Sequence, residues 1–296
     1  MSVLIRAIGV LPRRWIKAVA RLQWRHPLAK SAFDALANRI RHRDGRIQQG
    51  VGRGLRFNAG GSLAGFMLGT SAPGLQAAFQ LFAQPKMTAL DVGANVGFCS
   101  ILLARLVGAH GNVVSFEPMA SNARMIGRNA KANAYAHISV HELALGKVDG
   151  HVAFAVSENP NWGKLASLGA PAKMSGEQSV RVVRLDSLIR ERTVPPPDLI
   201  KIDVEGGETD VLEGAAETLR SARPILLIDL HGTNAAVARI LEEQGYDARV
   251  LGGGRTTLTE ARWDVEVVAV PRERADLARK LEQMANWSAN GRNAAS

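Results

Sequence analysis

The sequence predicts a doubly wound α/β fold with a mostly parallel sheet. Short β-rich runs alternate with helical runs after residue 70, runs such as Leu226-Leu227-Ile228 are apolar without interruption, and a glycine-rich turn follows the first strand. Uninterrupted apolar strands are typical of a sheet that helices cover on both faces. A chain of 296 residues with 46% hydrophobic and 22% charged residues can bury one such core, which excludes fibrous and largely disordered classes.

Residues 1–60 are expected to form a basic helical arm ahead of this domain. Apolar residues recur at helical spacing from Leu4 to Leu22, and residues 1–56 contain 13 Lys and Arg against two Asp. Because the whole chain has a net charge of +10, the remainder is close to neutral. Such an arm suits peripheral contact with an anionic membrane, although a helix docked on the domain shows the same pattern. We do not expect nucleic acid as a partner, since no aromatic platform accompanies the charge.

The domain itself is expected at residues 61–283, with a flexible tail at 284–296. Predicted strands are 88–92, 113–116, 138–145, 152–156, 180–185, 199–204, 225–230, 248–251 and 265–270, and predicted helices are 74–83, 98–107, 120–134, 209–221, 235–244 and a charged one from Pro271 to about residue 284. Segment 151–185 lacks a clear helix, which indicates an antiparallel insertion or additional pairing at the edge of the sheet. One cysteine and no long apolar run predict a cytoplasmic protein, with its arm at the inner face of the membrane.

The turn after the first strand, Asp91-Val92-Gly93-Ala94-Asn95-Val96-Gly97, is typical of a ligand-binding site. Gly93 and Gly97 permit a close approach to the backbone at the sheet edge where doubly wound folds bind ligands. Asp91 would repel a pyrophosphate and suits a cationic amine. The next strand ends at Glu117, where an acid accepts the hydroxyls of a ribose. An adenosine with a cationic tail describes S-adenosylmethionine better than NAD.

Four segments together resemble the FkbM family of S-adenosylmethionine-dependent methyltransferases. They are residues 91–97, Phe116-Glu117-Pro118, residues 199–206 with Glu208, and Arg223-Pro224-Ile225 leading to His231. The resemblance spans residues 87–231. It implies a class I methyltransferase sheet of seven strands with the last antiparallel, S-adenosylmethionine as cofactor, and O-methylation of a hydroxyl, often on a sugar or secondary metabolite. It also implies that Asp91, Gly93, Asn95, Gly97 and Glu117 hold the cofactor.

The fourth and fifth strands bring acids and a histidine to the same edge. Alternation along residues 199–204 predicts that Asp203 emerges beside the glycine turn, Glu205 follows it, and the fifth strand supplies Asp229 and His231. An alcohol becomes a better nucleophile when a carboxylate or a neutral imidazole takes its proton. Asp203 and His231 are therefore candidate catalytic bases, with Glu205 orienting the acceptor.

Two other interpretations of these residues stay open. The same four rim side chains match a divalent metal site, but no ligand spacing distinguishes one from an acid/base rim, so no metal is assigned. A nucleotide-cofactor oxidoreductase, or a non-enzymatic protein that binds lipid or RNA through its arm, also fits the fold. The acceptor is expected to be a small molecule or glycan with a hydroxyl group, and Trp162 is a candidate sugar platform.

Overall fold

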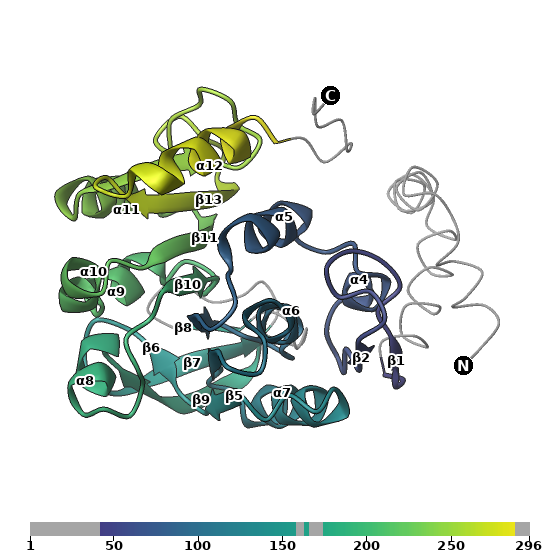
Figure 1. The fold of residues 1–296 in the computed structure, drawn as a ribbon. Coiled ribbons are helices and arrows are strands. Elements are labelled where there is room, and N and C mark those ends of the chain that lie inside the picture. Colours follow the sequence, from purple (N-terminus) through teal and green to yellow (C-terminus); the bar gives the residue numbers. More distant parts are fainter. Residues whose placement is uncertain (1–41, 158–162, 166–173, 288–296) are drawn as a thin grey trace, which may run out of the picture. The chain divides into compact units, whose positions relative to one another are not determined.

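The computed structural model describes residues 42–157, 163–165 and 174–287, which belong to two compact units divided between Ser71 and Ala72 (Figure 1). In the first unit, β1 (Gly45–Arg46) pairs antiparallel with β2 (Arg56–Phe57), and α4 (Ala64–Leu68) follows. Helix α4 ends at Gly69, whose φ of 72° suits a glycine. Residues 1–41 of the expected arm lie outside the described residues, so that part of the arm and its membrane contact stay predictions. The expectation of helix was wrong for residues 42–60, because this segment contains β1 and β2 and no helix.

The second unit is built on a seven-stranded sheet in the order β12-β13-β11-β10-β3-β4-β5. Its strands are β3 (Thr88–Val92), β4 (Asn112–Phe116), β5 (Ile138–His141), β10 (Leu199–Ile202), β11 (Ile225–His231), β12 (Tyr246–Val250) and β13 (Asp264–Pro271). Neighbouring strands from β11 to β5 are parallel, and β13 is antiparallel to both of its neighbours. This confirms the predicted fold class, including the antiparallel last strand.

Helices cover both faces of this sheet (Figure 1). One layer contains α5 (Pro73–Phe82), α6 (Phe98–Val107) and α12 (Ala275–Ala285), with α7 (Ala120–Ala132) beside α6; the other contains α8 (Leu185–Arg190), α9 (Glu208–Glu213), α10 (Ala216–Ser221) and α11 (Asn234–Glu243). Alternate strand residues such as Leu90, Ile200 and Leu226 pack with the second layer in one buried cluster. Burying each such side chain contributes about 1.5–3 kcal/mol relative to exposure, so this cluster anchors the strand ends that carry the site.

The insertion forms a separate four-stranded sheet in the order β6-β9-β7-β8. Its strands are β6 (Ala144–Leu145), β7 (Gly150–Ser157), β8 (Gly163–Leu165) and β9 (Met174–Val183). Strand β7 is antiparallel to both β8 and β9, which confirms the predicted antiparallel insertion. Trp162 lies outside the described residues.

Two predicted elements each divide into two in the structure. The strand expected at 138–145 divides into β5 and β6, which belong to different sheets. The helix expected at 209–221 divides into α9 and α10 at Gly214, where the backbone of Gly146 approaches so closely that any side chain would overlap it. The close approach of the Gly146 backbone therefore requires a glycine at the boundary between α9 and α10.

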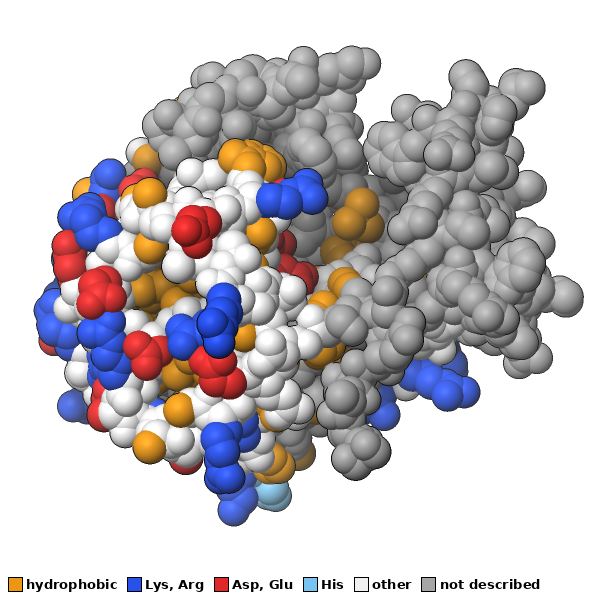
Figure 2. All heavy atoms as spheres, turned by 90° about the horizontal axis from the view of Figure 1, so that it is seen from above, with side chains coloured by type: hydrophobic (Ala, Val, Ile, Leu, Met, Phe, Trp, Pro, Cys, Tyr) orange, Lys and Arg blue, Asp and Glu red, His pale blue; other side chains and the backbone are white. Residues whose placement is uncertain are grey.

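The surface of the described residues carries both signs of charge. Figure 2 shows acidic and basic side chains interspersed over the described part of one face. Among the residues that the structure describes, no helix combines the length and apolar character needed to span a bilayer.

Candidate active site

The glycine turn between β3 and α6 is held by close packing. The N–H groups of Gly93 and Ala94 donate to the carbonyl of Phe116 at 3.1 and 3.0 Å. Gly93 has a φ of 73°, and a side chain there would overlap the carbonyl of Asp203. Gly97, with a φ of 84°, lies against Ile126 of α7. Both glycines therefore permit left-handed backbone and tight packing, which fixes the turn at the predicted edge.

Glu117 is brought to this turn from the end of β4. Its carboxylate accepts hydrogen bonds from the N–H of Asn95 at 2.8 Å, the N–H of Met119 at 3.0 Å and Nδ2 of Asn122 at 3.3 Å. Burial raises the pKa of Glu117 to about 7, although these hydrogen bonds oppose the shift. A carboxylate offers about four lone-pair sites, so Glu117 retains capacity to accept a further hydroxyl.

Asp91 does not lie at the rim, where the sequence predicted it. Its carboxylate is fully buried beneath α6, accepts a hydrogen bond from Ser100 Oγ at 2.6 Å and lies 3.1 Å from Lys201 Nζ. The prediction of a rim position was wrong because Asp91 points to the strand face that α6 covers. Its cationic partner in this structure is an internal lysine.

Lys201 connects the turn to Asp203 at the end of β10. Its Nζ donates to the carbonyl of Gly93 at 3.0 Å and lies 3.4 Å from Asp203 Oδ2. Burial would lower the pKa of Lys201, but the charges of Asp91 and Asp203 outweigh it and raise the pKa. Lys201 received no role from the sequence, although a lysine within an apolar strand is a signal that it has a buried partner.

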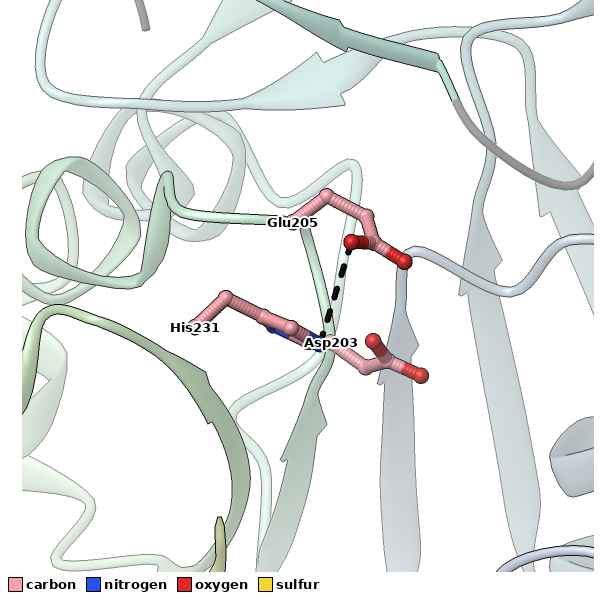
Figure 3. A group of neighbouring side chains, drawn as sticks. All are labelled: Asp203, Glu205 and His231. Carbon is pink, nitrogen blue, oxygen red and sulfur yellow. Dashed lines mark ion pairs between the residues drawn. The ribbon is translucent and has the colours of Figure 1, made fainter. Parts of the chain in front are cut away.

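Asp203, Glu205 and His231 converge at the carboxyl ends of β10 and β11, and their side chains point toward one another (Figure 3). Nε2 of His231 lies 3.8 Å from Oε2 of Glu205, and one ligand atom from each residue lies within 4.8 Å of the others. About a third of the Asp203 and Glu205 side chains is exposed, at 33% and 34%. The predicted convergence of these three residues is confirmed, and the partial exposure of the two acids leaves the group open to solvent.

Glu208 orients His231 from beneath. This fully buried carboxylate accepts from His231 Nδ1 at 3.2 Å, from Thr233 Oγ1 at 2.7 Å and from the N–H of Gly206 at 2.9 Å. Burial alone would raise the pKa of Glu208, but these hydrogen bonds lower it. Because Nδ1 faces Glu208, Nε2 is directed toward Asp203 and Glu205. Sequence reasoning placed Glu208 in a motif without a role.

The acids around His231 raise its pKa. Burial would lower the pKa of His231, but the hydrogen bond to Glu208 and the charges of Glu205 and Asp229 raise it to about 9. Asp229 lies deeper, and burial together with the Asp203 charge raises its pKa. Its register partner on β13, Glu266, has a pKa raised to about 8, chiefly by burial. Asp229 thus shapes the charge of the site but is not part of the close group of three.

A glycine turn beside a group of acids and a histidine, at one edge of a doubly wound sheet, is typical of an α/β enzyme, and comparison with known proteins identifies its family. A family model described as the methyltransferase FkbM domain matches residues 91–248, more than half of the chain. The chain belongs to the FkbM methyltransferase family. This membership makes S-adenosylmethionine its cofactor and favours methyl transfer over the oxidoreductase and non-enzymatic alternatives.

Known relatives include two methyltransferases of modest identity. The hexuronic acid methyltransferase AglP of Haloferax volcanii is 26% identical over 142 residues, which is 48% of this chain and 54% of that protein. The 2-O-methyltransferase NoeI of Sinorhizobium fredii is 27% identical over 156 residues, which is 48% of this chain and 63% of that protein. The chain thus spans little more than half the length of these relatives.

One solved structure, the methyltransferase FkbM of Methylobacillus flagellatus, matches with 22% identity and a TM-score of 0.43, over 62% of this chain and 43% of that one.

Proposed function

We propose that this chain is an O-methyltransferase that transfers a methyl group from S-adenosylmethionine to a hydroxyl of a sugar or glycan. The observation that carries the proposal is the convergence of Asp203, Glu205 and His231 beside the glycine turn. Similarity to a hexuronic acid methyltransferase and to a 2-O-methyltransferase supports a sugar hydroxyl over other secondary-metabolite hydroxyls.

On the donor side, the Gly93–Gly97 turn, Asn95 and Glu117 would hold the adenosine part of the cofactor. Glu117 fits this role because its carboxylate lies against the turn with acceptor capacity remaining. Asp91 would act from below by holding Lys201 against the carbonyl of Gly93. When bound, S-adenosylmethionine supplies a methyl group on a sulfonium and leaves as the thioether.

On the acceptor side, Nε2 of His231 would take the proton of the hydroxyl as its oxygen forms the new bond to carbon. Glu208 keeps the proton of His231 on Nδ1, so Nε2 is the basic atom once the ring is neutral. With a pKa of about 9, the ring is protonated at neutral pH, and the neutral form increases as the pH rises. Asp203 is the second candidate proton acceptor, and Glu205 would orient the acceptor.

The test is methyl transfer from labelled S-adenosylmethionine to methyl β-D-glucuronide, methyl β-D-glucopyranoside and a long-chain alcohol. We expect label in a pyranoside, on oxygen. Label only in the alcohol would contradict a sugar acceptor, and no binding of S-adenosylhomocysteine by calorimetry would contradict the whole proposal.

We also propose a cytoplasmic location with peripheral contact between residues 1–56 and anionic membranes, based on the charge of this segment. Flotation with vesicles that contain anionic lipid, compared with neutral vesicles, tests it. Equal recovery with both vesicle types would contradict the contact.

A further inference from the structure

Trp263 is an exposed aromatic residue at the edge of the candidate site. The residue is 65% exposed, unlike the large apolar residues of the core. It directly precedes β13, and its carbonyl accepts the N–H of Gly232 at 2.9 Å, one step beyond the pairing of His231 with Asp264. The backbone ladder therefore fixes Trp263 beside the strand end that carries the proposed base.

The indole ring is also held in position. Its centroid lies 5.9 Å from that of the His231 ring, at an interplanar angle of 75°. Gly232 has a φ of 84°, and a Cβ there would overlap Nε1 of the indole, so the ring packs over bare backbone. An edge-to-face contact and a glycine recess thus orient a side chain that still presents most of its surface to solvent.

Exposure increases outward across this group. The side chain of Glu208 is fully buried and that of His231 is 14% exposed, while Asp203 and Glu205 are about one-third exposed and Trp263 is the most open. The polar side chains proposed to bind and deprotonate a hydroxyl therefore lie next to an apolar aromatic surface. A pyranose matches this combination, because its hydroxyls surround a ring whose C–H faces complement the negative face of an aromatic ring.

We propose that Trp263 is the stacking platform that binds a pyranose ring of the acceptor and presents one of its hydroxyls to His231. This inference rests on the proposed function and narrows it to acceptors with a sugar ring. An acyclic alcohol offers no flat C–H face and would gain little from the indole.

The test is binding of methyl β-D-glucopyranoside to the full chain saturated with S-adenosylhomocysteine, measured by saturation-transfer NMR and titration. Open-chain glucitol is the ligand control. For Trp263→Ala we expect about 3–10-fold weaker binding of the pyranoside, the scale of one aromatic contact, whereas Trp263→Phe keeps most of the affinity. Glucitol should bind weakly to all forms.

Arg262→Ala is the matched protein control, because this neighbouring side chain is 88% exposed and should leave binding of the neutral pyranoside unchanged. Unaltered affinity of Trp263→Ala for S-adenosylhomocysteine shows that the variant is folded. Equal pyranoside affinity in wild type and Trp263→Ala, no pyranoside binding by wild type, or equal binding of glucitol, overturns the platform. Failure of wild type to bind S-adenosylhomocysteine instead overturns the proposed function.

Discussion

Different interactions dominate the two parts of the candidate site, the glycine turn with Glu117 and the acidic group around His231. On the proposed donor side, Glu117 is fixed by two backbone N–H groups and an amide, all of them neutral. On the proposed acceptor side, His231 is surrounded by carboxylates and its pKa is raised to about 9. Hydrogen bonds to neutral groups thus dominate the first side, and charge dominates the second. Substitutions should separate the two sides by affecting donor binding or turnover, but not both.

The largest effect is expected for His231→Asn. With His231 as the proposed general base, its loss should lower kcat by about 10²–10⁴-fold, whereas the affinity for S-adenosylhomocysteine should stay within twofold of wild type. Single-turnover kinetics and calorimetry measure the two quantities. The control is His110→Asn, an exposed histidine in the turn before β4, which should behave as wild type. A fall in donor affinity without a fall in kcat would show that His231 belongs to the donor side.

Lys201→Met should destabilise the fold that both sides share. It leaves the buried Asp91 without its cation, which costs about 3–5 kcal/mol in the free energy of unfolding. Urea unfolding at pH 7 measures the change. Lys147→Met removes a lysine paired with Asp210 at the same 3.1 Å distance, but its side chain is 53% exposed, so stability should hardly change. If both variants lose the same free energy of unfolding, burial is not the reason that the Lys201–Asp91 ion pair matters for stability.

Glu117→Ala should weaken binding of S-adenosylhomocysteine by about 10–100-fold, because hydrogen bonds to a charged group contribute about 1.5–3 kcal/mol. Calorimetry at pH 8, above the pKa of about 7, measures the effect with the carboxylate ionised. Glu205→Gln, on the acceptor side, should leave this affinity unchanged. If both variants weaken donor binding alike, the division of the edge into two sides is mistaken.

The pH dependence should also differ between the sides. Since His231 must be neutral to accept a proton, kcat/KM for the acceptor, measured with saturating S-adenosylmethionine, should increase as the pH rises toward about 9. Donor affinity should instead increase as the pH rises through about 7, where Glu117 ionises. Glu208→Gln removes the carboxylate that raises the pKa of His231, so it should move only the kcat/KM profile, toward lower pH. A flat kcat/KM profile would favour Asp203 as the base.

The smallest effect is expected from a chelator. Asp203, Glu205 and His231 have the donor types and spacing of a divalent metal site, yet the proposed acid/base mechanism needs no metal. Dialysis against EDTA should therefore leave kcat unchanged. Loss of activity that Mg²⁺ or Mn²⁺ restores would assign the group to a metal instead.

The order of the predicted strands was enough to predict which residues meet in much of this site. The glycine turn, Glu117 and the rim residues were predicted together because the carboxyl ends of parallel strands meet at one edge. Asp91 was misplaced, although its register with Lys201 puts both on the face beneath α6. Glu208 acts through contacts with His231 and Thr233, more than twenty residues away, and the strand at 138–145 changes sheets without a breaking residue. Such long-range contacts leave no local pattern in a single sequence.

The bare backbone at Gly232 has a consequence for comparison among homologues. Any residue with a Cβ at this position would displace the indole of Trp263. A homologue with a larger residue there must therefore place its aromatic side chain elsewhere or do without one. If Trp263 stacks on a sugar ring as proposed, the residue at this position in an alignment should separate family members that methylate pyranosides from those that methylate acyclic alcohols.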